Sequence, residues 1–155
     1  MSYSVLFVCL GNICRSPMAE AVFRDLVKSE GMESIITVDS AGTGDWHLGH
    51  PPHEGTRKLL DQNSISYDGM KARQLQDTDG GSFDLIVAMD TKNERDIQER
   101  LGHSTRSKVV RFLSFLPEKG IDDVPDPYYT GNFDEVYEMV KDGCMKILKQ
   151  IKTEL

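Results

Sequence analysis

The chain has 155 residues, of which 39% are hydrophobic, enough for one compact domain with a buried core but not for two. Its net charge of -7 is spread over mixed-sign segments without a lysine and arginine cluster, which argues against nucleic acid or an anionic membrane surface as a partner. No apolar run approaches the length of a membrane span, and the N-terminus lacks the layout of a secretory signal, so a cytoplasmic protein is expected.

The predicted elements alternate between strands and helices along the chain. Short apolar and β-branched runs predict strands at residues 5–8, 35–42, 83–90 and 108–116. Ser16 as N-cap and Pro17 in the first turn predict a helix that Gly31 ends, and helical patterns recur at residues 51–62, 91–101 and 133–151. A loop is expected at residues 117–132. This alternation predicts a parallel sheet with helices on both faces, in a single domain over residues 1–155.

The first strand leads into the segment CLGNICRS, residues 9–16, where the first helix begins. Backbone N–H groups at a helix start bind anions, and Gly11 and Asn12 tolerate the left-handed backbone that turns successive N–H groups inward. Arg15 can hold two oxygens of a phosphate at once. The sequence therefore predicts a phosphate-binding loop formed by Leu10, Gly11, Asn12, Ile13, Cys14, Arg15 and Ser16.

Cys9 lies at the base of this loop, where a helix N-terminus and a neighbouring arginine favour the thiolate over the thiol. A thiolate beneath a bound phosphate is a nucleophile. The alternative is that Cys9 is a buried residue at a strand end and Cys14 a small hydrophobic side chain. A cysteine, five residues, an arginine and a serine between a strand and a capped helix favour phosphate chemistry.

Five segments together resemble the low-molecular-weight protein tyrosine phosphatases, in the same order and over nearly the whole chain: VCLGNICRSPMAEAVF, DSAGTGDWHLG, KARQL, AMDTKN and DPYY. The resemblance implies a four-stranded parallel sheet in a Rossmann-like three-layer α/β fold, with no cofactor and no metal. It also implies hydrolysis of phosphotyrosine in proteins, and of small aryl phosphates, through a cysteinyl-phosphate intermediate. Tyrosine-phosphorylated proteins or peptides are then the expected partners, and a monomer is expected although no residue decides the oligomeric state.

Expulsion of a phenolate is helped by a proton donor, and Asp126 in the segment VPDPYY is the candidate. From spacing alone, a proline-stiffened turn with a solvated aspartate is the alternative, because Pro125 and Pro127 restrict the backbone on both sides. By resemblance, Asp126 matches the general acid of the family. The same carboxylate would then take a proton from water when the cysteinyl phosphate is hydrolysed.

The resemblance assigns supporting roles within the phosphate loop. Asn12 would hold the loop in its strained shape, and Ser16 would hydrogen-bond the Cys9 sulfur. Ser40 would brace Asn12, unless it is an ordinary serine at a strand end. Cys14 would close a disulfide with Cys9 on oxidation and protect it from over-oxidation, so redox regulation is expected.

Two residues depart from the family pattern, and one cysteine lies outside it. Met70 stands where many members carry a histidine linked to the serine and asparagine network, so Ser16 and Ser40 are expected to be braced differently. His53 replaces a common acidic residue, so contacts in its loop are expected to differ. Cys144 falls on the apolar face of the last helix and is assigned to the core.

Substrate choice depends on the side chains around the phosphate. A deep apolar slot for a phenyl ring, too deep for phosphoserine to reach its base, is expected from Leu10, Trp46, Tyr128 and Tyr129, although the aromatic residues could instead pack on neighbouring loops. The spacing of His47, His50 and His53 fits no standard ligand pattern, so no metal site is expected.

Three other functions are alternatives to phosphotyrosine hydrolysis. Thioredoxin-coupled arsenate reductases need a further cysteine pair, and residues 70–100 contain none. Protein-arginine phosphatases of the same fold typically carry threonine at the position of Ile13 and lack the tyrosine pair. A non-catalytic phosphopeptide-binding module would need neither a nucleophile nor an acid, whereas Cys9, Arg15 and Asp126 are all present.

Overall fold

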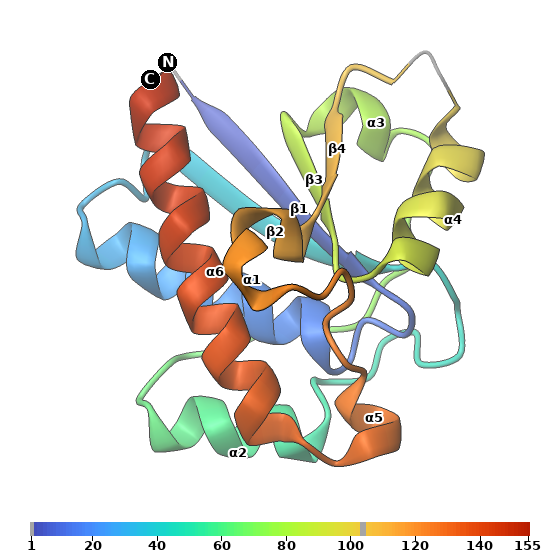
Figure 1. Ribbon diagram of the computed structural model, residues 1–155, viewed down its shortest axis with the longest axis vertical. Coiled ribbons are helices and arrows are strands. Elements are labelled where there is room, and N and C mark those ends of the chain that lie inside the picture. The colour runs from blue at the N-terminus through green and yellow to red at the C-terminus, as the bar shows by residue number, and fades with distance from the viewer. Residues whose placement is uncertain (1, 103–104) are drawn as a thin grey trace.

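The computed structural model describes residues 2–102 and 105–155 (Figure 1). Its strands are β1 (Tyr3–Cys9), β2 (Ile36–Gly42), β3 (Leu85–Ala88) and β4 (Lys108–Arg111). Its α-helices are α1 (Arg15–Ser29), α2 (Glu54–Gln62), α3 (Asp79–Ser82), α4 (Thr91–Leu101), α5 (Pro127–Thr130) and α6 (Phe133–Glu154). Two short 3₁₀ helices, η1 (Phe112–Phe115) and η2 (Pro117–Lys119), follow β4.

The four strands form one sheet in the order β2-β1-β3-β4, and every neighbouring pair is parallel. In register, Cys9 at the end of β1 lies opposite Gly42 at the end of β2, and Val8 lies opposite Ala88 at the end of β3. The predicted four-stranded parallel sheet is confirmed. Its carboxyl edge, where ligands collect in open parallel sheets, therefore carries Cys9.

Helices cover both faces of the sheet, as the alternating pattern predicted. In Figure 1, α1, α2 and α6 lie on one side of the strands, and α3 and α4 lie on the other. Successive side chains of β1 point to opposite faces, so Phe7 joins the core beneath α1 and α6, whereas Val8 joins the core beneath α4. Phe7 packs edge-on against Phe23 of α1 with ring centroids 5.7 Å apart.

The structure corrects three of the predicted boundaries. Helix α1 begins at Arg15, and Ser16 is not its N-cap because the Ser16 hydroxyl is bound by Asn12 instead. Strand β4 ends at Arg111, where the Ser114 hydroxyl donates to the Arg111 carbonyl at 2.6 Å and the chain turns into η1 rather than continuing as a strand to residue 116. Helix α2 begins at Glu54, three residues after the predicted start.

Short helices also form where the sequence predicted only loop. The segments η2 and α5 lie within the expected loop at residues 117–132, and α3 lies in a stretch that gave no helical pattern. Asp126 caps α5 by accepting a hydrogen bond from the Tyr128 N–H at 3.1 Å. The general acid candidate is therefore held as the N-cap of a short helix.

Candidate active site

The loop between β1 and α1 is tied to the protein through its carbonyl groups. The carbonyls of Cys9 and Leu10 accept hydrogen bonds from the N–H groups of Thr43 and Gly44, each at 2.9 Å. Within the part of the chain that the structure describes, no N–H group of residues 10–14 donates to an acceptor. These N–H groups are available to an oxyanion, as expected for a loop that feeds a helix N-terminus.

The shape of the loop depends on one left-handed residue and one close approach. Asn12 has a φ of 56°, in the left-handed region that asparagine tolerates better than most residues. Gly42, at the end of β2, lies so close that a Cβ there would be 2.8 Å from the Leu10 carbonyl oxygen. Any larger residue at position 42 would push the loop away from the sheet.

Arg15 lies where the loop meets α1 and is held by acceptors on two other segments. Its Nη1 donates to Asp90 Oδ2 at 2.7 Å and to the Val124 carbonyl at 3.0 Å, and its Nη2 donates to Asp126 Oδ2 at 3.4 Å. Burial disfavours its charged form, yet the negative charges of Cys9, Asp90 and Asp126 outweigh this effect and raise the pKa of Arg15. Its Nε is buried without a partner among the described residues, which suits contact with an oxyanion.

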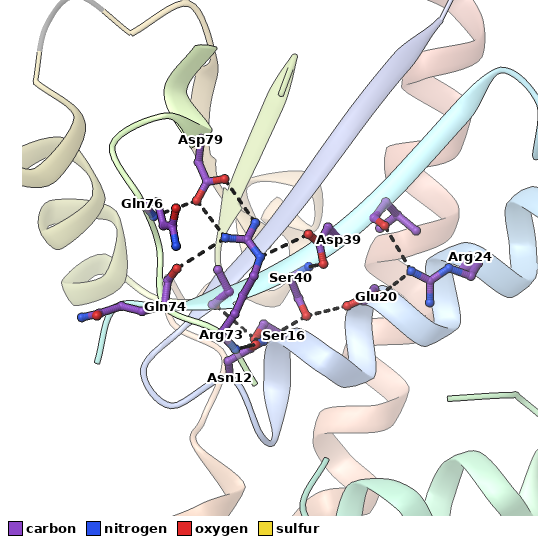
Figure 2. Close-up of polar contacts among 12 residues, drawn as sticks. Asn12, Ser16, Glu20, Arg24, Asp39, Ser40, Arg73, Gln74, Gln76 and Asp79 are labelled. Atoms are coloured by element: carbon purple, nitrogen blue, oxygen red, sulfur yellow. Dashed lines mark hydrogen bonds and ion pairs between the residues drawn. The ribbon is translucent and has the colours of Figure 1, made fainter. Parts of the chain in front are cut away.

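A chain of hydrogen bonds runs from the Cys9 sulfur to a buried carboxylate, and Figure 2 shows its part from Ser16 and Asn12 through Ser40 to Glu20. Cys9 Sγ lies 3.0 Å from Ser16 Oγ, and the Asn12 amide donates to Ser16 Oγ at 2.7 Å and to Ser40 Oγ at 2.9 Å. Ser40 Oγ in turn donates to Glu20 Oε1 at 2.6 Å. Because a carboxylate only accepts, Ser40 gives its hydrogen to Glu20. Ser16 accepts from Asn12, so its own hydrogen is left for the Cys9 sulfur at 3.0 Å, with the Ala41 carbonyl at 3.4 Å as the more distant acceptor.

Glu20 is the partner that this chain offers Ser40. Glu20 is 5% exposed and also forms an ion pair with Arg24, one turn further along α1. Met70, at the position where many family members carry histidine, packs at the edge of the main hydrophobic core. Among the described residues, Ser40 is thus held by Glu20, and Met70 packs against the core and takes no part in the hydrogen-bond network.

The loop forms the floor of a pocket of about 360 Å³. All four predicted wall residues line it, and so does His47; the complete lining is Cys9, Leu10, Gly11, Ile13, Cys14, Trp46, His47, Asp126, Tyr128 and Tyr129. Trp46 and Tyr129 remain 67% and 73% exposed, so they lie at the rim. The pocket therefore offers an apolar wall above a polar floor.

The histidines near the pocket take part in aromatic packing and helix capping. His53 stacks on Phe133 with centroids 5.1 Å apart, and its Nδ1 accepts a hydrogen bond from the Gly55 N–H that caps α2. His47 and His53 both contact the ring of Tyr128, with centroids 5.9 Å apart in each pair. Over residues 2–102 and 105–155, no three histidine, cysteine or acidic side chains are arranged to hold a metal ion.

All three cysteines are free thiols and all are buried. Burial, helped by the charges of Cys9 and Asp126, raises the pKa of the Cys14 thiol well above its ordinary value. Cys144 is fully buried on α6, as predicted, and burial raises its pKa as well.

Sequence reasoning missed Glu20 and Asp90. Asp90 is the last residue of the third predicted strand, and the ends of parallel strands meet at one edge, so its position beside the loop of Cys9 could have been found. Glu20 lies one helical turn after Ser16 among buried and mostly apolar residues of α1, and a carboxylate in such a position needs polar partners.

Comparison with known proteins identifies the family. The family model for low molecular weight phosphotyrosine protein phosphatase matches residues 4–155. The low molecular weight protein-tyrosine-phosphatase YfkJ of Bacillus subtilis (strain 168) is 52% identical over 151 residues, which cover 97% of each chain. PtpA of Staphylococcus aureus (strain MRSA252), which bears the same description, is 46% identical over 147 residues, covering 95% of this chain and 92% of PtpA.

Solved structures agree with this assignment. The crystal structure of YfkJ superimposes with a TM-score of 0.96 at 51% identity, covering 99% of this chain and 97% of YfkJ. A Drosophila arginine phosphatase superimposes with a TM-score of 0.88 at 32% identity, covering 96% of this chain and 97% of that one. The chain belongs to the low-molecular-weight protein tyrosine phosphatase family, and it is an enzyme that hydrolyses phosphotyrosine.

Proposed function

We propose that Cys9, Arg15 and Asp126 carry out phosphotyrosine hydrolysis in two steps. The observation that supports this assignment is their convergence: Cys9 and Asp126 line the same pocket, and Arg15 reaches Asp126 at 3.4 Å from where the loop meets α1. Unpaired N–H groups of the loop and the partnerless Nε of Arg15 would bind the phosphate oxygens.

In the first step, the Cys9 thiolate attacks phosphorus. A sulfur–phosphorus bond forms and the bond from phosphorus to the phenolic oxygen breaks, while the protonated carboxyl of Asp126 gives its proton to that oxygen. Tyrosine leaves with a neutral hydroxyl. Arg15 and the loop N–H groups stabilise the charge on the equatorial oxygens of the transition state.

In the second step, water attacks the phosphorus of the cysteinyl phosphate. The Asp126 carboxylate takes a proton from this water, the sulfur–phosphorus bond breaks, and Cys9 leaves as a thiolate. The Ser16 hydroxyl, 3.0 Å from Cys9 Sγ, would stabilise the departing sulfur. Phosphate is released, and the enzyme returns to its starting protonation state.

Phosphoarginine is the second candidate substrate, because a neighbouring structure is that of an arginine phosphatase. The pocket supports an aryl phosphate better. Its lining is largely apolar and aromatic, with Ile13 in the floor and Tyr128 and Tyr129 at the side, and this suits a phenyl ring more than a guanidinium group.

We further propose that residues 1–155 act as one monomeric catalytic domain on tyrosine-phosphorylated proteins in the cytoplasm. Three reduced, buried cysteines support a reducing compartment. None of the helices in residues 2–102 and 105–155 is both long and apolar enough to cross a membrane.

The test is hydrolysis of p-nitrophenyl phosphate, a phosphotyrosine peptide and a phosphoarginine peptide in the presence of a chelator. Wild type should prefer phosphotyrosine, Cys9→Ser should be inactive, and Asp126→Ala should lose most activity on substrates with poor leaving groups. Asp122→Ala is the matched control, since Asp122 is an exposed carboxylate of the same segment that pairs with Arg111 at 3.0 Å. If wild type binds the phosphopeptide but does not hydrolyse it, the chain is a phosphopeptide-binding module and not a catalyst.

A further inference from the structure

The amide of Asn12 is held from two sides. Its nitrogen donates to Ser16 and Ser40, as described above, and its oxygen accepts a hydrogen bond from the backbone N–H of Arg73 at 3.0 Å. Asn12 is only 3% exposed, so water cannot replace these partners. The Arg73 N–H is thus the donor that fixes which way the amide faces.

The backbone around Arg73 is bonded to the end of β2. The Gly42 N–H donates to the Arg73 carbonyl at 2.8 Å, and the Leu75 N–H donates to the Gly42 carbonyl at 2.8 Å. Gly42 is the residue that also allows the close approach of the phosphate loop. The segment at Arg73 therefore lies against the sheet and the loop together.

The side chain of Arg73 fastens this segment further (Figure 2). Its two terminal nitrogens donate to both carboxylate oxygens of Asp79 at 3.0 and 3.2 Å, and its Nε donates to Asp39 Oδ2 at 3.2 Å. Asp79 Oδ2 also accepts from the Gln76 N–H at 2.8 Å, so the guanidinium closes the loop over residues 73–79 onto β2. Burial disfavours the charged form, but Asp79 and Asp39 outweigh it and raise the pKa of Arg73.

The two carboxylates are unequal partners. The side chain of Asp79 is 9% exposed and binds in the two-pronged geometry that favours arginine, whereas that of Asp39 is 46% exposed and contributes less. A lysine cannot reproduce three directed bonds to two carboxylates. The contacts thus demand a guanidinium at this position.

We propose that Arg73 is a positioning residue for catalysis. Its side-chain contacts keep its backbone N–H in place as a donor to the Asn12 oxygen, and this fixes the orientation of the Asn12 amide. That orientation leaves the Ser16 hydroxyl free to donate to the Cys9 sulfur. This rests on the proposed function, in which Cys9 is the nucleophile. If the Asn12 amide turned over, its NH₂ group would face the Arg73 N–H and its oxygen would face Ser16. Ser16 would then donate to Asn12 and not to the Cys9 thiolate.

The test compares Arg73→Met and Arg73→Lys with Arg106→Met. Arg106 is the matched control because it pairs with Asp84 at 2.8 Å and binds the Gly81 carbonyl, both before β3 begins and so away from the phosphate loop. Three quantities are measured for each: kcat and KM for p-nitrophenyl phosphate, the thermal midpoint, and the pH midpoint for alkylation of Cys9 by iodoacetamide, located by peptide mapping. Alkylation needs no turnover, so it separates the role of Arg73 from the proposed function itself.

For Arg73→Met, kcat should fall by roughly 10- to 100-fold, the scale of a remote misplacement of about 1 Å, and the alkylation midpoint should move to higher pH. Arg73→Lys should show a smaller change in the same direction, and Arg106→Met should keep both wild-type values. If Arg73→Met does not fold, Arg73→Lys and Asp79→Asn carry the same expectation. A wild-type kcat and alkylation profile in the folded variants, with only the thermal midpoint lowered, would overturn the proposal. If the wild-type protein shows no turnover, the proposed function is overturned, and the alkylation profiles still test the role of Arg73.

Discussion

Replacing Asn12 by alanine and by glycine separates two contributions to the free energy of unfolding: the cost of its left-handed backbone and the gain from its side-chain hydrogen bonds. Asn12 has a φ of 56° and makes side-chain hydrogen bonds at 2.7, 2.9 and 3.0 Å. Asn12→Ala removes these bonds and places a Cβ-bearing residue in the left-handed region without a compensating polar side chain. Asn12→Gly removes the same bonds but relieves the backbone.

The magnitudes follow from these two terms. Three hydrogen bonds at about 1 kcal/mol each give a loss of ~3 kcal/mol in the free energy of unfolding for both variants. Left-handed backbone costs an alanine roughly 1–2 kcal/mol, partly offset by the greater freedom of glycine in the unfolded chain. Asn12→Gly should therefore be more stable than Asn12→Ala by about 1 kcal/mol, although both lose the same side-chain contacts.

Urea unfolding of the two variants measures this difference. Ser64 provides the control, because it is an exposed residue with a φ of 57° outside the site, so Ser64→Gly and Ser64→Ala report the backbone term by itself. Both Asn12 variants should also lose kcat, since Ser16 is no longer oriented. Equal stability of Asn12→Gly and Asn12→Ala, with a normal difference at Ser64, would refute the reasoning.

Three further predictions follow from single contacts. Glu20→Gln should lower kcat about tenfold, because an amide can donate to Ser40 as well as accept from it; an equal loss in Arg24→Met would assign the effect to the exposed ion pair instead. Peroxide should inactivate wild type reversibly, and Cys14→Ser that still recovers fully with dithiothreitol would exclude Cys14 as the resolving thiol. Burial opposes ionisation of Asp84, but hydrogen bonds from Arg106 and Ser4 lower its pKa below 3.8. The carboxylate therefore stabilises the fold above that pH, and this contribution disappears as the pH falls through the folded-state pKa. Asp84→Asn should lose less stability than wild type in this acid range, and a parallel loss in both proteins would contradict the prediction.

The sheet and the long helices could be predicted from sequence because local pattern and tertiary structure agree there. The β-branched run around Val8 is buried on both faces, as a central parallel strand requires. The apolar face of α6, which includes Val140 and Ile147, is buried as its periodicity predicted. The glycine-containing motif at residues 9–16 likewise predicted a loop between the first strand and the first helix, where the structure has one.

The misses occur where side chains bind distant segments. Ser16 has the chemistry of an N-cap, but its hydroxyl accepts a hydrogen bond from Asn12, and the N-cap is Cys14, two residues earlier. The run at residues 108–116 is rich in apolar and β-branched residues and predicts a strand, yet the chain turns after Arg111 and Phe112 packs against Phe7. Neighbouring residues do not indicate the partners of Asp90 and Arg73, because these partners lie 75 and 61 residues away in the chain.

A rapid acid quench during turnover of a phosphotyrosine peptide tests the central claim most directly. Peptide mapping of the quenched enzyme should locate phosphate on the Cys9 sulfur, and no covalently bound phosphate should be found in Cys9→Ser. Phosphate found on another side chain, such as His47 in the pocket lining, or turnover by Cys9→Ser at the wild-type rate, would contradict a cysteinyl-phosphate mechanism at this loop.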